Sequence, residues 1–252
     1  MSTKEILIRR NTVLEALRAK RREIYQLWIQ QGEQKNKLIR PILHEARQQG
    51  VRITEANKNK LSQMADAGDH QGVLLEVGPY PYADVEDILA VAREREEKPF
   101  ILVFDLIQGT QNVGTLLRTA EICGVHGVVM QERRAPDITP LIVQYSVGAA
   151  EHLHIAQVTN IVQTIESLKE QNVWVAGMDM GEDAVMLGQM DLDRPLAIVV
   201  GNEGSGLRRL VRESCDFIIQ LPMRGRVESL NASVAGSVMI YQAWQARGFK
   251  GA

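Results

Sequence analysis

The chain has 252 residues, of which 45% are hydrophobic and 24% charged, and its formal net charge is −2. This size and composition agree with an ordinary soluble enzyme and allow two modest domains, each with its own core. No apolar run reaches the roughly 18 residues of a membrane span, and no signal peptide pattern opens the sequence. We therefore expect a cytoplasmic protein without a membrane partner.

Charge is distributed unevenly along the chain. Residues 1–72 contain 14 Lys or Arg against 8 Asp or Glu, a net of +6, so residues 73–252 carry a net of −8. A basic N-terminal region followed by an acidic remainder predicts that residues 1–72 bind phosphate groups. Chance variation of surface charge is the alternative. The candidate phosphate contacts are Arg9, Arg10, Arg18, Lys20, Arg21 and Arg22.

Cysteine and histidine give no sign of a metal site. Cys123 and Cys215 lie in separate apolar contexts, so we expect neither a disulfide nor a zinc site. His152 and His154 alternate on a predicted strand, a pattern more typical of packing than of a metal pair.

The first third of the chain predicts a small α/β unit. Its hydrophobic patterning indicates helices at 10–19, 37–48 and 57–65, with extended segments at 24–29, 51–53 and 71–77. The segment Gly78–Tyr82 contains two prolines and is the clearest linker, with Tyr80 and Tyr82 able to pack on either domain. A helix capped by Asp84 and running to about Glu96 follows it.

The rest of the chain alternates apolar strands with helices, which predicts a parallel sheet. We place strands near 101–105, 126–130, 173–178, 196–200 and 217–221. One helix is expected to begin at Asn112 as its N-cap and to end before Gly124, and a long small-residue helix to cover about 231–246.

Two successive strands end in loops that are rich in small residues. The strand at 196–200 runs into Gly201, Gly204 and Gly206, and the strand at 217–221 runs into Pro222 and the Ser229–Asn231 turn. Loops at the carboxyl ends of parallel strands bind ligands, so two in succession predict one composite pocket. The G-x-x-G-x-G spacing fits neither a dinucleotide fingerprint nor a phosphate loop, and the glycines instead allow close backbone approach to an adenine or ribose edge.

Three ordered motifs over residues 98–247 resemble the SpoU/TrmH family of RNA 2′-O-ribose methyltransferases, in the knotted SPOUT superfamily. The resemblance is carried by Asn112, Gly114, Arg118, Ala120 and Gly124, by Val200–Leu207, by Leu221–Met223 with Ser229–Ser233, and between them by Ser146, Gly148, Ala149 and Glu151. It implies an α/β fold in which a mainly parallel sheet contains a deep trefoil knot. It further implies a small α/β RNA-binding domain at 1–78, a linker and lead-in helix at 79–97, and the methyltransferase domain at 98–252.

The resemblance also implies S-adenosylmethionine as methyl donor, bound within residues 200–231, and no metal. The implied cofactor contacts are Gly201, Leu221, Met223 and Leu230, although ordinary core packing is the alternative for the two leucines. The implied catalytic residues are Asn112, Arg118, Glu203, Ser229 and Asn231, although helix capping is the alternative for the two asparagines.

Arginine has a solution pKa above about 12 and is a poor base, so orienting the 2′-hydroxyl or clamping a phosphate is the safer role for Arg118. Glu203 could hold Arg118 or a backbone amide in place. One departure from the family pattern stands before Asn112, where Gly109-Thr110-Gln111 replaces the Asp-Pro pair of many relatives. This change leaves the nucleotide preference open.

The favoured function is therefore 2′-O-methylation of RNA, with large-subunit ribosomal RNA as the preferred target. A tRNA 2′-O-methyltransferase and a non-catalytic RNA-binding or ribosome-assembly protein are the alternatives. The resemblance also implies a homodimer whose interface includes the helix at 231–246. Apolar surface for it is offered by Val234, Val238, Ala243 and Trp244.

Overall fold

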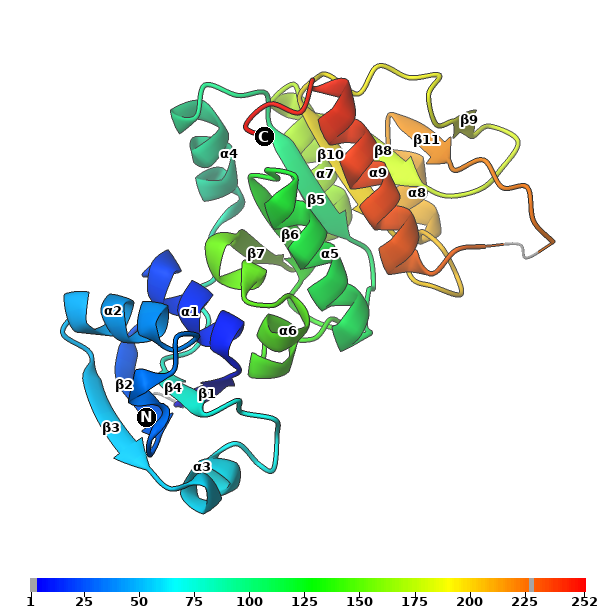
Figure 1. The fold of residues 1–252 in the computed structure, drawn as a ribbon. Helices are drawn as coiled ribbons and strands as arrows, with labels where there is room; N and C mark the ends of the chain where they lie inside the picture. The colour runs from blue at the N-terminus through cyan, green and yellow to red at the C-terminus, as the bar shows by residue number, and fades with distance from the viewer. Residues whose placement is uncertain (1–3, 227–228) are drawn as a thin grey trace. The chain divides into compact units, whose positions relative to one another are not determined.

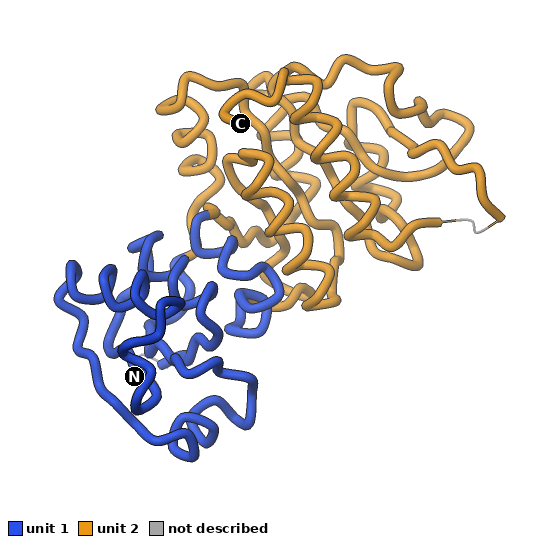
Figure 2. The backbone as a smooth tube through the Cα atoms, viewed as in Figure 1, with its two compact units in different colours: residues 1–81, 138–152 blue, residues 82–137, 153–252 orange. Residues whose placement is uncertain are grey.

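The structure is a computed structural model that describes residues 4–226 and 229–252 (Figure 1). Val227 and Glu228, which fall in the predicted cofactor segment, lie outside the described residues. The chain forms two compact units, each built from two stretches of sequence (Figure 2). Unit 1 comprises residues up to Pro81 together with Ile138–His152, and unit 2 comprises Tyr82–Asp137 with Leu153–Ala252.

Unit 1 contains a four-stranded sheet in the order β1-β4-β2-β3, in which β2 and β3 are parallel and the other neighbours antiparallel. Its elements are β1 (Glu5–Ile8), α1 (Arg10–Ala19), β2 (Ile24–Gln30), η1 (Glu33–Lys35), α2 (Arg40–Gln48), β3 (Arg52–Ala56), α3 (Lys58–Met64), β4 (Val73–Val77), α6 (Pro140–Tyr145) and η2 (Ala149–His152). The predicted elements of this region are present, and β1 is an additional strand that the sequence pattern did not reveal.

The stretch 138–152 belongs to unit 1 because buried polar groups join it to the N-terminal part of the chain. The guanidinium of Arg22 is fully buried and lies 3.0 Å from the equally buried carboxylate of Glu151. The hydroxyl of Tyr80 donates to the carbonyl of Ala150 at 2.9 Å. His152 is not on a strand as expected, since it lies in η2 with Nε2 2.8 Å from the carboxylate of Glu15. The compact units therefore differ from the contiguous domains that the sequence suggested.

Unit 2 is a seven-stranded sheet in the order β7-β6-β5-β10-β8-β11-β9, and every neighbouring pair in it is parallel. Its strands are β5 (Phe100–Phe104), β6 (Gly127–Gln131), β7 (His154–Val158), β8 (Trp174–Met178), β9 (Val185–Met186), β10 (Leu196–Val200) and β11 (Phe217–Gln220). Its helices are α4 (Val85–Glu94), α5 (Thr110–Ile122), α7 (Ile161–Glu170), α8 (Arg209–Ser214) and α9 (Ala232–Ala246). The five strands named from the sequence and the mainly parallel sheet are confirmed.

Helices cover both faces of this sheet, so its central strands are apolar on both sides. Buried side chains of α4, α7 and α8 form one cluster with Val103, Val175 and Val199. On the other face α5 packs against α9, where a Cβ on Gly236 would lie 2.6 Å from Leu116. The path of the chain through a trefoil knot stays a prediction. In the part of the chain that the structure describes, no helix combines the length and apolar character needed to cross a membrane.

Candidate functional site

A cavity of about 400 Å³ opens in unit 2 where β8, β10 and β11 end. Three loops and the start of α9 form its wall, and it lies where the sequence predicted a composite pocket from two of these loops. The lining residues are Met178–Met180, Val200–Gly206, Ile219–Leu221, Met223, Ser229, Leu230, Ala232 and Ala235. Pockets for small ligands have volumes of roughly 300–1,000 Å³ and combine apolar walls with a few polar groups, so this cavity suits a nucleoside-sized molecule.

The loop after β10 is held in place by its own backbone and by the neighbouring strand end. Asn202 and Gly206 exchange two backbone hydrogen bonds of 3.1 and 3.0 Å, and the Asn202 amide donates to the carbonyl of Leu106 at 2.9 Å. The fully buried carboxylate of Asp105 accepts from the backbone and side chain of Arg208 at 2.8 and 2.6 Å. The wall of the cavity formed by this loop is therefore preorganised.

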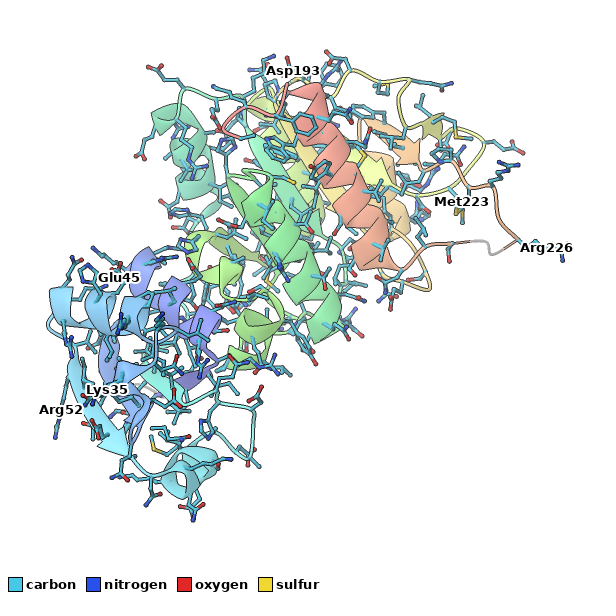
Figure 3. All side chains as sticks on the ribbon, viewed as in Figure 1. Lys35, Glu45, Arg52, Asp193, Met223 and Arg226 are labelled. Atoms are coloured by element: carbon cyan, nitrogen blue, oxygen red, sulfur yellow. The ribbon has the colours of Figure 1, made fainter. Side chains whose placement is uncertain are left out.

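The fold of this loop requires a glycine at position 201. A Cβ at Gly201 would lie 2.5 Å from the carbonyl of Gly206, which is backbone and cannot move aside. A valine at this position would disrupt the loop before it filled the cavity, so it is a poor probe of ligand binding. Of the other predicted cofactor contacts, Leu221, Met223 and Leu230 all line the cavity, and the side chains of Met223 and Leu230 are exposed there (Figure 3 labels Met223). Neither of these two exposed side chains is ordinary core.

Three of the predicted catalytic residues meet at one side chain. The amide nitrogen of Asn231 donates to Asn112 Oδ1 at 3.2 Å and to Glu203 Oε1. The amide oxygen of Asn231 accepts from the backbone N–H of Ser233 at 2.9 Å and of Val234 at 3.2 Å, so the same residue caps α9. Capping and a site role are compatible here, because they use opposite ends of the amide.

Asn112 is not the N-cap of its helix as the sequence suggested. Helix α5 begins at Thr110 with Gly109 as N-cap, and its first backbone bond runs from Val113 N–H to the Gly109 carbonyl at 3.0 Å. The Gly-Thr sequence that replaces the family's Asp-Pro pair therefore forms the helix start. Asn112 lies within the first turn, and its side chain is free to bond Asn231.

Arg118 and Ser229 lie outside this hydrogen-bonded group. Arg118 is exposed on α5, and within the described residues it has neither an ion pair nor a side-chain hydrogen bond. Glu203 does not hold Arg118 in this structure, because its carboxylate accepts from the Asn231 amide instead. Ser229 lines the cavity beside Leu230.

The loop after β8 contributes lining residues that the sequence analysis did not select. Asp179 accepts the backbone N–H of Met180 at 2.8 Å and lies 3.6 Å from the guanidinium of Arg212. Gln220 and Ala235 also line the cavity. The signal for Asp179 was available, since the predicted strand at 173–178 ends directly before it and strand ends in parallel sheets form sites. Ala235 carried no such signal.

The arginines that the sequence suggested as phosphate contacts are largely occupied within unit 1. Arg22 is buried and bonds Glu5, Glu151 and the Gly78 carbonyl, so its selection as an RNA contact was wrong. Arg18 pairs with Glu15 at 2.9 Å, and Arg10 lies 3.5 Å from Glu33. Arg9 lies 4.0 Å from Asp69, and Arg21 donates to the Tyr80 hydroxyl and the Pro81 carbonyl, both at 3.3 Å. Lys20 is exposed.

The thiols and potential metal ligands show no reactive arrangement. Burial raises the pKa of Cys123 to about 11 and that of Cys215 to about 12, so both are protonated thiols near neutral pH. In the described ranges, no group of three His, Cys, Asp or Glu side chains could hold a metal ion.

Comparison with known proteins matches two successive regions of the chain to family models. The family described as "SpoU rRNA Methylase family" matches residues 99–241, and the one described as "RNA 2'-O ribose methyltransferase substrate binding" matches residues 10–83. A Bacillus subtilis protein, whose name assigns it to the TrmH family of tRNA/rRNA methyltransferases, is 40% identical over 245 residues, covering 96% of each chain. A Staphylococcus haemolyticus protein named for the same family is 39% identical over 242 residues, again covering 96% of each chain.

Solved structures share the fold at lower identity. The SpoU methyltransferase AviRb from Streptomyces viridochromogenes, solved in complex with AdoMet, has a TM-score of 0.80 and 21% identity, covering 98% of this chain and 91% of its own. An AdoMet-bound rRNA methyltransferase from Sinorhizobium meliloti has a TM-score of 0.78 and 20% identity, covering 96% and 87%. A family match over more than half of the sequence, with relatives that align along nearly its whole length, leads to one conclusion: the chain belongs to the SpoU rRNA methylase family.

Proposed function

We propose that the protein transfers a methyl group from S-adenosylmethionine to a ribose 2′-hydroxyl of RNA, and that large-subunit ribosomal RNA is its target in the cytoplasm. The hydrogen-bonded group of Asn112, Glu203 and Asn231 carries this proposal. Glu203 lines the cavity, and Asn231 lies between the lining residues Leu230 and Ala232. The three hydrogen-bonded residues come from all three sequence motifs.

The residues around the cavity fit an adenosine-containing methyl donor. Apolar side chains such as Met178, Ile219 and Leu221 offer contact to a base, and the glycine loop after β10 offers backbone groups to polar edges. When bound, the donor supplies an electrophilic methyl group on a sulfonium.

The protein must then orient the 2′-hydroxyl for in-line attack and help to remove its proton. Asn112 can position the ribose by donating through its amide nitrogen. Both amide N–H groups of Asn231 are used by Asn112 and Glu203, so Asn231 holds the Asn112 side chain in place. Arg118 is exposed and unpaired among the described residues, which suits contact with a neighbouring phosphodiester.

Two further parts of the proposal concern partners. The solved rRNA methyltransferase from Sinorhizobium meliloti aligns with 96% of this chain, whereas the A. aeolicus TrmH/SpoU tRNA-modifying enzyme aligns with 66%, which favours a ribosomal over a tRNA target. A homodimer is favoured by an exposed apolar face on α9, formed by Val234, Val238 and Tyr241 at helical spacing. Ala243 is fully buried, so it does not belong to that face as expected, whereas Trp244 is half-buried and packs on Tyr241 and Phe249.

The cofactor placement is tested with the substitution Ala235→Phe. Ala235 lines the cavity from α9, so the larger ring would occupy ligand space without breaking a backbone hydrogen bond. We expect calorimetric titration to show S-adenosylmethionine affinity reduced by about 5- to 140-fold, because overfilling a packed site costs roughly 1–3 kcal/mol. The control Ala246→Phe changes an exposed alanine at the far end of the same helix. Equal affinity of both folded variants and the unmodified protein would place the cofactor elsewhere.

A further inference from the structure

A second concave surface lies on unit 1, at a distance in sequence from the methyltransferase motifs. It is a groove of about 450 Å³ along α2, here called the α2 groove, lined by Gln34, Arg40, Leu43, His44 and Arg47. Arg40, His44 and Arg47 follow each other at four- and three-residue spacing, so they share one face of the helix. All three are exposed, whereas Leu43 is buried and forms the floor.

The two arginines of the α2 groove differ from four other arginines of unit 1 in having no acidic partner among the described residues. Within the described residues neither Arg40 nor Arg47 makes an ion pair or a side-chain hydrogen bond, whereas Arg18 pairs with Glu15 at 2.9 Å. The groove therefore presents two unneutralised guanidinium groups.

Two of the three acids near the groove in sequence are already engaged. Glu33 lies 3.5 Å from Arg10 and accepts from Asn36, and Glu55 accepts from the Gln34 amide. Glu45, the one acid of α2, is half-buried, and its side chain has neither a hydrogen bond nor an ion pair within the described chain. Figure 3 labels its position.

Further positive charge lies near the groove in sequence. Residues 33–60 contain seven Lys or Arg against three Asp or Glu, so this stretch supplies +4 of the +6 carried by residues 1–72. Lys35 in η1 and Arg52 in β3 are exposed members of this set, and both are labelled near β3 in Figure 3. The excess charge of the basic N-terminal region is thus concentrated in η1, α2, β3 and α3 and away from the paired arginines of α1.

We propose that the α2 groove binds the phosphodiester backbone of the RNA substrate. A guanidinium presents five donors in a planar fork that matches phosphate oxygens, and Arg40 and Arg47 are about 10 Å apart along the helix axis, so each can bind a different phosphate. Gln34 and His44 add further hydrogen-bonding groups to the groove. Contacts of this kind position an RNA without reading its sequence. This inference rests on the proposed function, because it takes RNA as the substrate.

The test compares the double substitution Arg40→Gln/Arg47→Gln with the unmodified protein. The probe is an in vitro transcript of large-subunit ribosomal RNA, and its affinity is measured by fluorescence anisotropy across a salt series. Loss of two phosphate contacts should weaken binding roughly tenfold near 0.1 M salt and lower the slope of log affinity against log salt by about 1.4. The KM for RNA should rise while kcat and the affinity for S-adenosylmethionine stay unchanged, since the cavity in unit 2 is untouched.

Two controls keep this result specific. Arg18→Gln removes an arginine of the same unit that is already paired with Glu15, and it should leave affinity and slope unchanged. Arg40→Lys/Arg47→Lys keeps the charge and should retain most of the slope.

Unchanged affinity and slope in a folded Arg40→Gln/Arg47→Gln protein would overturn the groove as an RNA contact, as would an equal loss in Arg18→Gln. An unmodified protein that binds S-adenosylmethionine but no ribosomal transcript at any salt concentration would instead overturn the proposed substrate, and the groove assignment with it.

Discussion

The side-chain amide of Asn231 presents two chemically different ends to its surroundings. Its oxygen accepts the first N–H groups of α9, and its nitrogen donates to Asn112 and Glu203. A residue with only the first property would still begin the helix. The two roles can therefore be separated by a substitution that keeps the acceptor and removes the donor.

Asn231→Asp makes that separation. Aspartate caps helices about as well as asparagine, but it cannot donate to Asn112, and its charge would repel Glu203. We expect the thermal unfolding midpoint to change little and methyl transfer to fall by about 10²-fold, the usual cost of losing a positioned donor. Tritium transfer to ribosomal RNA measures the activity. A variant as active as the unmodified protein would leave Asn231 with capping alone.

Arg118 is expected to act on the RNA side of the reaction. It is exposed and is not among the residues that line the cavity, so Arg118→Ala should keep the affinity for S-adenosylmethionine and lose most methyl transfer. The comparison is between calorimetric titration with the cofactor and tritium transfer to the RNA. Full transfer activity in Arg118→Ala would contradict a role in the reaction, and reduced cofactor affinity would contradict the assignment to the RNA side.

At the scale of elements, α9 has one face in the core and one facing out. Gly236, Met239 and Ile240 are buried, whereas Val234 and Val238 are 47% and 40% exposed. If the outward face forms the proposed dimer interface, Val238→Glu places a charge against its own copy and should convert the dimer to a monomer at micromolar concentration. Sedimentation velocity distinguishes the two masses.

Leu210→Glu is the matched control for this prediction. It changes an apolar residue of α8 that is 55% exposed, and α8 packs on the opposite face of the sheet from α9. It should leave the dimer intact. A monomeric unmodified protein, or loss of the dimer in both variants, would remove the support for an interface on α9.

Sequence patterning predicted the elements that have strong local signals and missed those fixed by distant partners. Helix α1 and strand β10 have the predicted bounds, because their apolar periodicity is continuous. The start of α5 was misplaced, since Gly109 rather than Asn112 takes the cap position. Among site residues, motif resemblance selected Glu203 and Asn231, but no local pattern encodes the hydrogen bond between them. The ion pair that engages Arg22 likewise depends on a residue far away in sequence.

At the scale of the whole molecule, the discontinuous make-up of unit 1 depends on the buried pair of Arg22 and Glu151. Burial raises the pKa of Glu151 while the Arg22 guanidinium lowers it, and burial prevails. A buried charge without its partner costs roughly 3–5 kcal/mol, whereas replacing both partners with apolar groups is often neutral. Arg22→Met and Glu151→Leu should therefore each destabilise unit 1 strongly, and the double variant should recover much of the loss. Chemical denaturation of the four proteins tests this cycle, and simply additive losses would contradict coupling between the two residues.

The same pair bears on how the chain can fold while it is being synthesised. Arg22 and Glu151 are 129 positions apart, so the first unit lacks part of its interior when residue 81 leaves the ribosome. At roughly 5–20 residues per second, the missing stretch follows on the order of 4–14 s later. During that interval Arg22 is without its final partner, because Glu151 has not yet been synthesised. Strands β5 and β6 of the second unit emerge in the meantime. The order of synthesis is thus not the order of completion, because the N-terminal unit can reach its native core only after β5 and β6 of its neighbour have been made.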